Sequence, residues 1–533
     1  MSTLTIPPRV MMFKEGIPNS VRILLCLFFV ISFQFSGGVY LSSVTQMYSS
    51  LALMQEDIMM AGYASFVGMT VVFPILFRLK FRFTSRTAML VICPALILCN
   101  LITMLTDNVP LLVVTCFIAG ALRMWGTFEN LSSIQLNITP TRNFAVFFPV
   151  VYLIVLGSIQ LSGLTTVYLS YWSNWHYMHW FIMGVLGIVW LCAALFTRHI
   201  RFAKPLPLYG IDWLGGALWA IFLLALIFVF VYGEHYDWFY SSYIRAAIVT
   251  ALIALMLSIN RMFTRRHPYI SPETFRYKHT MPLLFLFLAL CIFLATPNVL
   301  QNLFTGAILK YDPLNAVSLN WWNFLGLVIG CVWTYYWHVH CRGGYKVAAF
   351  VGFACIVGYQ CMMYFLIDPR MNIEWLYLPT MLRGAGYIIL YISLTVCVTG
   401  VVPFKHFFQF LALLGFIRTG VGSPLGSAIF NRWMNHLIPE NMQLLTSGLD
   451  AVHPATSHIP LGGLYQEAMR QTLLVSIKEI YGWVCIVGLI FLLMILSYRY
   501  FNKIGVGRLP GMSQVRRILK RDSLVTHKRE VVN

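Results

Sequence analysis

The stretch Gly120-Ala121-Leu122-Arg123-Met124-Trp125-Gly126-Thr127-Phe128-Glu129-Asn130 places a cation and an anion inside a long apolar segment, from Val109 to about Ile134. A segment of that length can cross a lipid bilayer as a helix. A charge at such depth costs roughly 2.5–3.5 kcal/mol on insertion scales, so charged residues inside membrane segments usually have a function. The stretch therefore predicts a membrane-spanning helix that lines the path of a transported solute.

The composition of the whole chain is that of a membrane protein. Of the 533 residues, 59% are hydrophobic and 10% are charged, and the mean hydropathy is +0.75. Apolar runs recur from end to end, which leaves no soluble domain large enough for enzyme chemistry. The twelve Cys lie mostly inside these runs without a C-x-x-C pattern, so we interpret them as small apolar side chains.

Apolar runs of about 20 residues predict about fourteen membrane spans, with boundaries good to a few residues. They lie near 21–41, 58–77, 86–106, 109–134, 144–171, 177–197, 213–232, 241–262, 281–304, 316–338, 345–366, 374–398, 404–432 and 480–501.

The distribution of charge predicts the topology. One set of alternate loops, together with both termini, carries about 28 of the 37 Lys and Arg residues, nine of them in the tail after residue 498. The opposite loops carry acids instead, such as Glu56-Asp57, Asp107 and Asp312. The basic side is therefore expected in the cytoplasm with both termini, which requires an even number of spans. This distribution also explains the net charge of +19 without a nucleic-acid partner.

An internal repeat links the two ends of the chain. Met381-Leu382-Arg383-Gly384-Ala385-Gly386 shares the pattern Leu-Arg-x-x-Gly with the opening stretch. In the following spans, the Gly- and Ser-rich segments 157–163 and 418–424 correspond at a similar offset. Small residues of this kind let helices pack closely. The repeat predicts two six-span halves, with Arg123 and Arg383 at matching places.

Further motifs carry a resemblance to a known family. They are Asp212-Trp213-Leu214-Gly215, Arg266-His267-Pro268-Tyr269-Ile270, Pro297-Asn298-Val299-Leu300-Gln301, and Arg418-Thr419 with the Gly/Ser run that follows. In this order and spacing, the chain resembles the fourteen-span drug:proton antiporters of the EmrB/QacA type, within the major facilitator superfamily. The resemblance implies an all-α major facilitator fold of 6 + 2 + 6 helices.

The expected division of the chain follows from this layout. It comprises a six-helix bundle over 1–205, a two-helix insertion with a basic linker over 206–278, a six-helix bundle over 279–504 that includes an outward-facing loop with some helix at 436–479, and a basic tail over 505–533.

The chain departs from the family at three places. The segment 76–86 keeps only the basic part of the family's loop after the second span, and the Gly-Pro signature of the fifth span is absent from 157–165. The first span has no acidic residue. These departures concern proton antiport rather than the fold.

Glu129 is the candidate proton carrier, because every other acid lies in a loop or at the end of a span. The alternative is a solvated carboxylate at the cytoplasmic mouth. Arg123 lies six residues away, about 600° around a helix, so we expect the two to act separately. The resemblance implies a coupling role for Arg123, and the alternative is a static bond to backbone carbonyls that holds helices together. Arg383 and Arg418 are buried cations without an acid in their spans, and they either take part in transport or anchor the packing.

Polar and aromatic residues in cavity-lining spans are the candidate substrate contacts. They are Gln160, Asn298, Gln301, Asn302, Trp322 and Asn323. For Trp322, a place in an interfacial aromatic belt is the alternative. The His pairs 176/179 and 338/340 lie at span ends without converging Cys or carboxylate, so no metal site is predicted.

The sequence thus predicts a secondary transporter of the plasma membrane or the bacterial inner membrane that exports amphiphilic small molecules in exchange for protons. No cofactor is expected, and no nucleotide motif indicates an ATP-driven pump. In a Gram-negative cell, the resemblance implies a periplasmic adaptor and an outer-membrane channel as partners. The alternatives are a uniporter or importer of a native metabolite and, more remotely, an integral membrane enzyme.

Overall fold

The computed structural model describes residues 12–39, 41, 44, 46–47, 53–199, 208, 210–341, 343–447 and 461–498. Regular structure in these ranges is helical, apart from one isolated bridge between Phe13 and Thr197. Thirteen helices of the described part are long and apolar enough to cross a membrane. The shorter apolar helix α1 (Asn19–Phe35) occupies the place of the first predicted span. The predicted all-α polytopic fold is therefore confirmed. The basic tail over 505–533 lies outside the described residues.

The helices before residue 200 pack on one another and form an N-terminal group. Its members are α1, then α3 (Gln55–Val71), which continues through η2 (Phe73–Ile75) into α4 (Leu76–Arg82), followed by α5 (Ser85–Leu105), α6 (Val109–Ile138), α7 (Phe144–Trp172) and α8 (His176–Phe196). A middle pair follows, made of α9 (Trp213–Tyr232) and α10 (Ser242–Thr264) with the short η3 (Trp238–Tyr240) between them.

The helices after residue 279 form a C-terminal group. They are α12 (Thr280–Phe293) with the π-helical segments η4 (Pro297–Gln301) and η5 (Phe304–Ile308), α13 (Pro313–Ala316), α14 (Leu319–Val339), α15 (Tyr345–Leu366), η6 (Ile373–Leu376) with α16 (Tyr377–Val401), α17 (Phe404–Gly415) with the π-helical η7 (Phe416–Gly422) and α18 (Ser423–Thr446), and α19 (Leu461–Ser497). The short α11 (Glu273–Arg276) lies in the linker between the groups.

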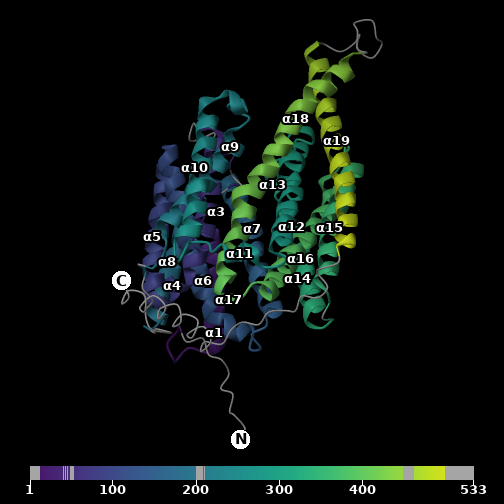
Figure 1. Cartoon of the computed structure of the whole chain (residues 1–533). Helices are drawn as coiled ribbons and strands as arrows, with labels where there is room; N and C mark the ends of the chain where they lie inside the picture. The colour runs from purple at the N-terminus through teal and green to yellow at the C-terminus, as the bar shows by residue number, and fades with distance from the viewer. Residues whose placement is uncertain are drawn as a thin grey trace.

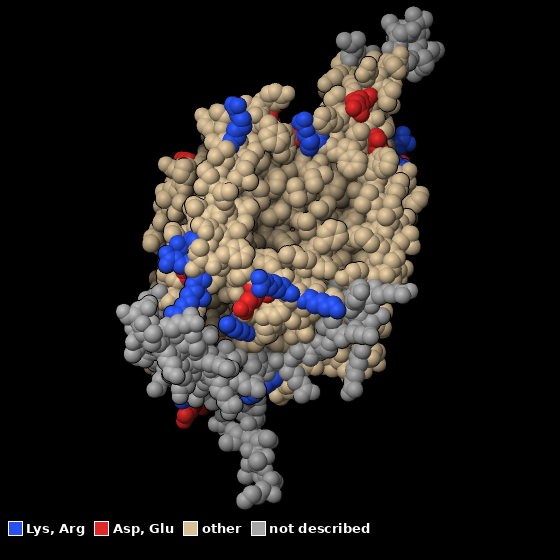
Figure 2. All heavy atoms as spheres, in the orientation of Figure 1, with Lys and Arg blue, Asp and Glu red and all other residues tan. Residues whose placement is uncertain are grey.

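The two groups stand side by side and meet through a few helices (Figure 1). Helix α7 packs against α14 and α16, while α17 and η7 pack against η2 and α3. Helix α9 packs on α3 and also contacts α18 and η7, so the middle pair stands at the seam between the groups. In space-filling view, charged side chains gather toward the two ends and leave an uncharged band between them, as a bilayer requires (Figure 2).

The segment 436–479 is more helical than the sequence suggested. Helix α18 runs on to Thr446 and α19 begins at Leu461, so much of the expected loop consists of two helical extensions beyond the bundle (Figure 1). The Asn441 side chain joins them, because its Nδ2 donates to Ser476 Oγ at 2.9 Å and to Glu479 Oε2 at 3.3 Å. The polar character of this segment reflects a place outside the apolar band rather than a loss of helix.

Glycines allow backbone-to-backbone contact in equivalent helix pairs of the two groups. In the pair α3 and α6, a Cβ on Gly120 would lie 1.8 Å from Ser65 O, and one on Gly68 would lie 2.0 Å from Phe117 O. In the pair α14 and α16, a Cβ on Gly326 would lie 2.1 Å from Met381 O. The second and fourth long helices of each group therefore pack in the same way, and Arg123 and Arg383 follow these contacts closely in sequence.

The contact at Gly120 gives a test of the packing. The substitution Gly120→Ala pushes a methyl group into the backbone of α3, and overpacking of this kind costs about 1–3 kcal/mol. We expect a fall of several degrees in the thermal unfolding midpoint of the purified protein in detergent. The control is Gly187→Ala in α8, where a Cβ meets nothing within 4 Å and helix propensity favours alanine. Equal midpoints for the two variants would contradict the close approach of α3 and α6.

Candidate functional site

Two adjoining cavities lie between the N-terminal and C-terminal groups. The first has a volume of about 280 Å³, and we name it the arginine cavity because Arg383 and Arg418 line it. The second has a volume of about 210 Å³, and we name it the aromatic cavity for its many Phe and Tyr side chains. Four residues line both cavities, namely Phe66, Tyr391, Arg418 and Thr419. The two cavities are therefore parts of one central site.

Arg418 lies where the two cavities meet. It belongs to the π-helical segment η7, and such wide turns are frequent at functional sites. Its Nη1 donates to Tyr391 Oη at 3.0 Å. The guanidinium also lies 5.0 Å from the ring centre of Tyr391 and 6.0 Å from that of Tyr387. Aromatic faces and one hydroxyl thus surround this cation, and they stabilise its charge without neutralising it.

Arg383 is held by a buried polar network behind the cavity wall. Its Nη1 donates to Gln301 Oε1 at 3.2 Å, and its guanidinium lies 5.5 Å from the ring centre of Tyr359. Tyr359 Oη donates to the same Gln301 oxygen at 2.8 Å and contacts Tyr481 Oη at 3.3 Å. Gln301 was predicted as a substrate contact. Since it does not line either cavity, its direct effect is to position Arg383.

Arg123 lines the aromatic cavity from α6. It is 5% exposed, and its guanidinium lies 5.8 Å from the ring centre of Phe66. Three arginines, Arg123, Arg383 and Arg418, therefore line the central site. No Asp or Glu of the described residues lines either cavity.

Glu129 lies outside both cavities, in a buried ion pair. It is 1% exposed, so the alternative of a solvated carboxylate is wrong. Lys80 Nζ lies 2.5 Å from Glu129 Oε1, and Ser85 Oγ donates to the same oxygen. Lys80 also donates to Ser133 Oγ at 3.1 Å. The partner comes from the segment 76–86, which the resemblance placed in the basic loop after the second span, and for this reason Lys80 was missed.

A cluster of phenylalanines joins the two groups next to this ion pair. We name it the aromatic plug. The ring centre of Phe77 lies 4.4 Å from that of Phe408 and 5.5 Å from that of Phe404, and Phe128 lies 5.6 Å from Phe408. Phe144 of α7 packs on Phe407 of α17 at 5.4 Å in the same way. Phe77 is one turn before Lys80 and Phe128 directly precedes Glu129, so the plug and the ion pair share two backbone segments.

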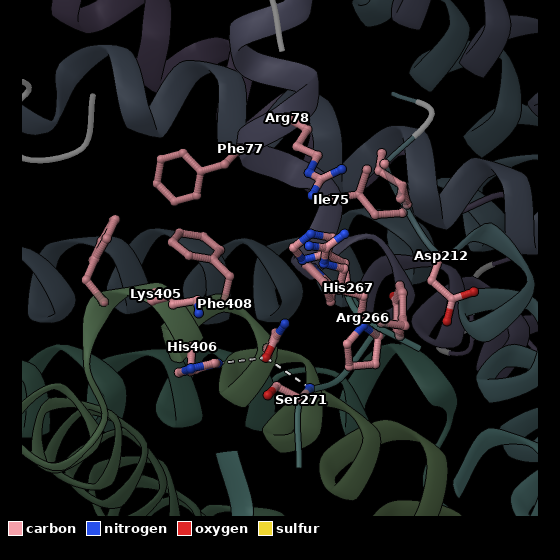
Figure 3. A pocket seen from close by; sticks show the side chains of 17 residues that line it. Ile75, Phe77, Arg78, Asp212, Arg266, His267, Ser271, Lys405, His406 and Phe408 are labelled. Atoms are coloured by element: carbon pink, nitrogen blue, oxygen red, sulfur yellow. Dashed lines mark hydrogen bonds between the residues drawn. The ribbon is translucent and has the colours of Figure 1, made fainter. Parts of the chain in front are cut away.

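A pocket beyond the plug shows how the linker is fixed (Figure 3). Its lining includes five basic side chains from α4, the linker and α17, namely Arg78, Arg266, His267, Lys405 and His406. Gln409 Oε1 accepts from Ser271 N at 3.1 Å and lies 3.1 Å from His406 Nδ1, while His406 Nε2 lies 2.9 Å from Glu273 Oε2. The linker is thus bound to the start of α17, on the basic side of the plug.

The remaining predicted substrate contacts fall in different places. Gln160, Asn298 and Asn323 line the arginine cavity. Asn323 is 6% exposed, and its Oδ1 has no hydrogen-bond partner among the described residues. Asn302 is exposed and lies outside both cavities. Trp322 also lies outside them, where it is 36% exposed and stacks on Tyr377 at 4.8 Å between ring centres.

Comparison with known structures shows that the chain shares its fold with solved transporters of nucleosides and peptides. A mutant of the nucleoside transporter NupG superposes with a TM-score of 0.53 at 12% identity, over 90% of this chain and all of that one. A structure of proton-dependent oligopeptide transporters gives 0.54 at 14% identity, over 90% and 98% of the two chains. A peptide transporter of the POT type gives 0.53 at 15% identity, over 90% and 95%. No known protein family and no curated protein sequence matches the chain.

The ion pair can be tested by removing one partner or both. Glu129→Gln leaves the Lys80 ammonium buried without a counter-charge, which costs about 3–5 kcal/mol. We expect a marked fall in the thermal unfolding midpoint in detergent. The double variant Lys80→Met with Glu129→Leu removes both charges and should recover most of that loss.

The exposed pair of Arg198 and Glu15 provides the control. Glu15 is 83% exposed, so Glu15→Gln should change the free energy of unfolding by less than about 1 kcal/mol. If Glu129→Gln is as mild as this control, Lys80 and Glu129 do not form a buried pair.

Proposed function

We propose that the protein is a secondary transporter that moves a small amphiphilic solute across the membrane by alternating access. The observation that carries this proposal is the central site between the two groups of helices, lined by residues of both. In such transporters a solute binds near the bilayer midplane and the two halves rock about it. The fold shared with solved transporters of nucleosides and peptides supports the same function.

The central site is closed toward the basic side of the molecule, and this closure indicates which state of the transport cycle the structure represents. The aromatic plug separates the aromatic cavity from the basic side, which the charge distribution assigns to the cytoplasm. Away from the plug, Asn298 lines the arginine cavity and is exposed. We therefore infer that this state is closed toward the cytoplasm. The charge distribution of the loops supports a plasma or inner membrane with both termini on the cytoplasmic side.

Efflux in exchange for protons, as in drug:proton antiporters, is the finer proposal. Protonation of Glu129 would remove the charge that holds Lys80 and so weaken the contact of α4 with α6 beside the plug. Proton uptake would in this way favour opening toward the cytoplasm. The absence of a carboxylate from both cavities, among the described residues, favours the second candidate, a uniporter or importer without proton antiport. A periplasmic adaptor and an outer-membrane channel remain partners implied by resemblance alone.

Cysteine labelling tests alternating access without knowledge of the solute. A cysteine in place of Asn298 should react with a membrane-impermeant maleimide from outside intact cells. The double substitution Phe77→Ala with Phe408→Ala removes the centre of the plug, favours opening toward the cytoplasm, and should slow that reaction several-fold.

The control position is Trp172, which is 85% exposed at the end of α7. A cysteine there should react equally in both backgrounds. A rate at Asn298→Cys that does not depend on the plug would refute the coupling between the plug and the far side of the site.

Proton coupling needs a transported solute, which a tolerance screen of overexpressing and deletion strains across a panel of amphiphiles can supply. In vesicles containing a pH-sensitive dye, addition of that solute should move protons through the wild type. It should move none through Lys80→Met with Glu129→Leu, which keeps the packing and lacks the titratable group. Solute transport without proton movement in the wild type would establish the uniporter or importer instead.

A further inference from the structure

We propose that the transported solute is an amphipathic organic anion, whose acidic group lies between Arg383 and Arg418 and whose apolar body extends into the aromatic cavity. The inference rests on the proposed transport function and names its substrate class. It departs from the expectation of amphiphilic drugs in general, because the central site carries charge of one sign.

The charge of the site selects between classes of solute. Arg123, Arg383 and Arg418 are the charged side chains among the described residues that line the two cavities. Arg418 is surrounded by tyrosines, and Arg383 by Gln301 and Tyr359, all of them neutral. Both guanidinium groups are partly buried, and no carboxylate of the described residues lines their cavity, so an anion bound there supplies a counter-charge. A cationic solute would add to the repulsion, and a neutral one would leave both arginines without a counter-charge.

The geometry of the donors fits an acidic group. A guanidinium has five N–H donors, and in the described part Nη1 of Arg383 donates to Gln301 Oε1 and Nη1 of Arg418 donates to Tyr391 Oη. Both residues line one cavity of about 280 Å³, so an acidic group bound there lies within reach of both guanidinium groups. Two guanidinium forks are well suited to a carboxylate, sulfonate or phosphate, each of which accepts paired hydrogen bonds. The amides of Gln160, Asn298 and Asn323 line the same cavity and offer further N–H donors.

The aromatic cavity provides room for the rest of the solute. It adjoins the arginine cavity at Phe66 and Tyr391, and its walls include Met69, Phe148 and Tyr152. Flat, polarisable side chains of this kind bind apolar groups over a large area without fixed hydrogen bonds. Joined together, the two cavities fall within the range of about 300–1,000 Å³ usual for small-molecule sites. An acid with an aromatic or alkyl body therefore matches both parts of the site.

Direct binding to the purified protein tests this inference. The probes share one apolar body and differ in charge: naphthaleneacetate and naphthalenesulfonate, the neutral naphthaleneacetamide, and the cationic naphthylmethylammonium. Affinities are measured by isothermal titration in detergent. We expect both anions to bind at least about tenfold more tightly than the amide, because each gains charge-assisted hydrogen bonds. The ammonium probe should bind most weakly. Equal affinities across the four probes would overturn the proposal.

Substitutions locate the acidic group. Arg383→Gln and Arg418→Gln should each weaken binding of the anions by about tenfold or more and leave binding of the amide unchanged. Arg370→Gln is the matched control, since Arg370 is exposed and lies outside both cavities. Should a Gln variant fail to fold, Arg418→Lys keeps the charge and loses the planar fork, and it should weaken anion binding to a smaller extent. Anion binding that survives both Gln substitutions would refute the assignment.

Transport assays separate this inference from the proposed function. If the anions bind as expected but cross vesicles containing the protein no faster than empty vesicles, the transport function fails and the anion site stands. If a cationic or neutral solute is transported and the anions do not bind, the transport function stands and the anion site fails.

Discussion

A charge withdrawn from water is costly unless it is paired, and the charged side chains near the seam between the two groups meet this constraint in two ways. Glu129 and Lys80 satisfy it within the chain, beside the aromatic plug, and their contact stabilises the closed side of the molecule. Arg383 and Arg418 are partly buried, and they contact amide, hydroxyl and aromatic groups without charge. The first pair therefore connects α4 to α6, and the second pair lines the site that we propose an external anion completes.

The central helices hold these charges in place by very close packing. Glycines bring α3 against α6 and α14 against α16, so that the two arginines of the internal repeat project from helices with little freedom to shift. Two π-helical segments of the C-terminal group contribute residues to the lining of the arginine cavity. Segment η7 carries Arg418, and η4 carries the Gln301 that orients Arg383. A wide turn has weaker hydrogen-bond geometry than an α-helix, so these are the places where the C-terminal helices can most readily bend around a solute.

Much of the fold could be predicted from hydropathy and charge, because a helix that crosses a bilayer needs a long apolar run wherever it packs. The place of Arg123 in the fourth long helix, matched by Arg383, followed from the internal repeat. The partner of Glu129 could not be found in this way, since Lys80 stands among basic residues that resemble a solvated loop. The positions of Gln301 and Trp322 outside the cavities could not be predicted either, because hydropathy does not show which face of a helix meets a cavity.

The charged side chains that line the central site, among the described residues, are all positive. Their charge determines how transport of an anion responds to the membrane potential. A carrier that neutralises a monoanion with its own fixed arginines returns empty with those positive charges, so each cycle moves net charge across the membrane. In a cell whose interior is negative by about 100 mV, the membrane potential favours exit of a monoanion by about 2.3 kcal/mol, or a concentration ratio of about fiftyfold. Export of such a solute draws on this potential directly, whereas uptake of the same solute has to overcome it.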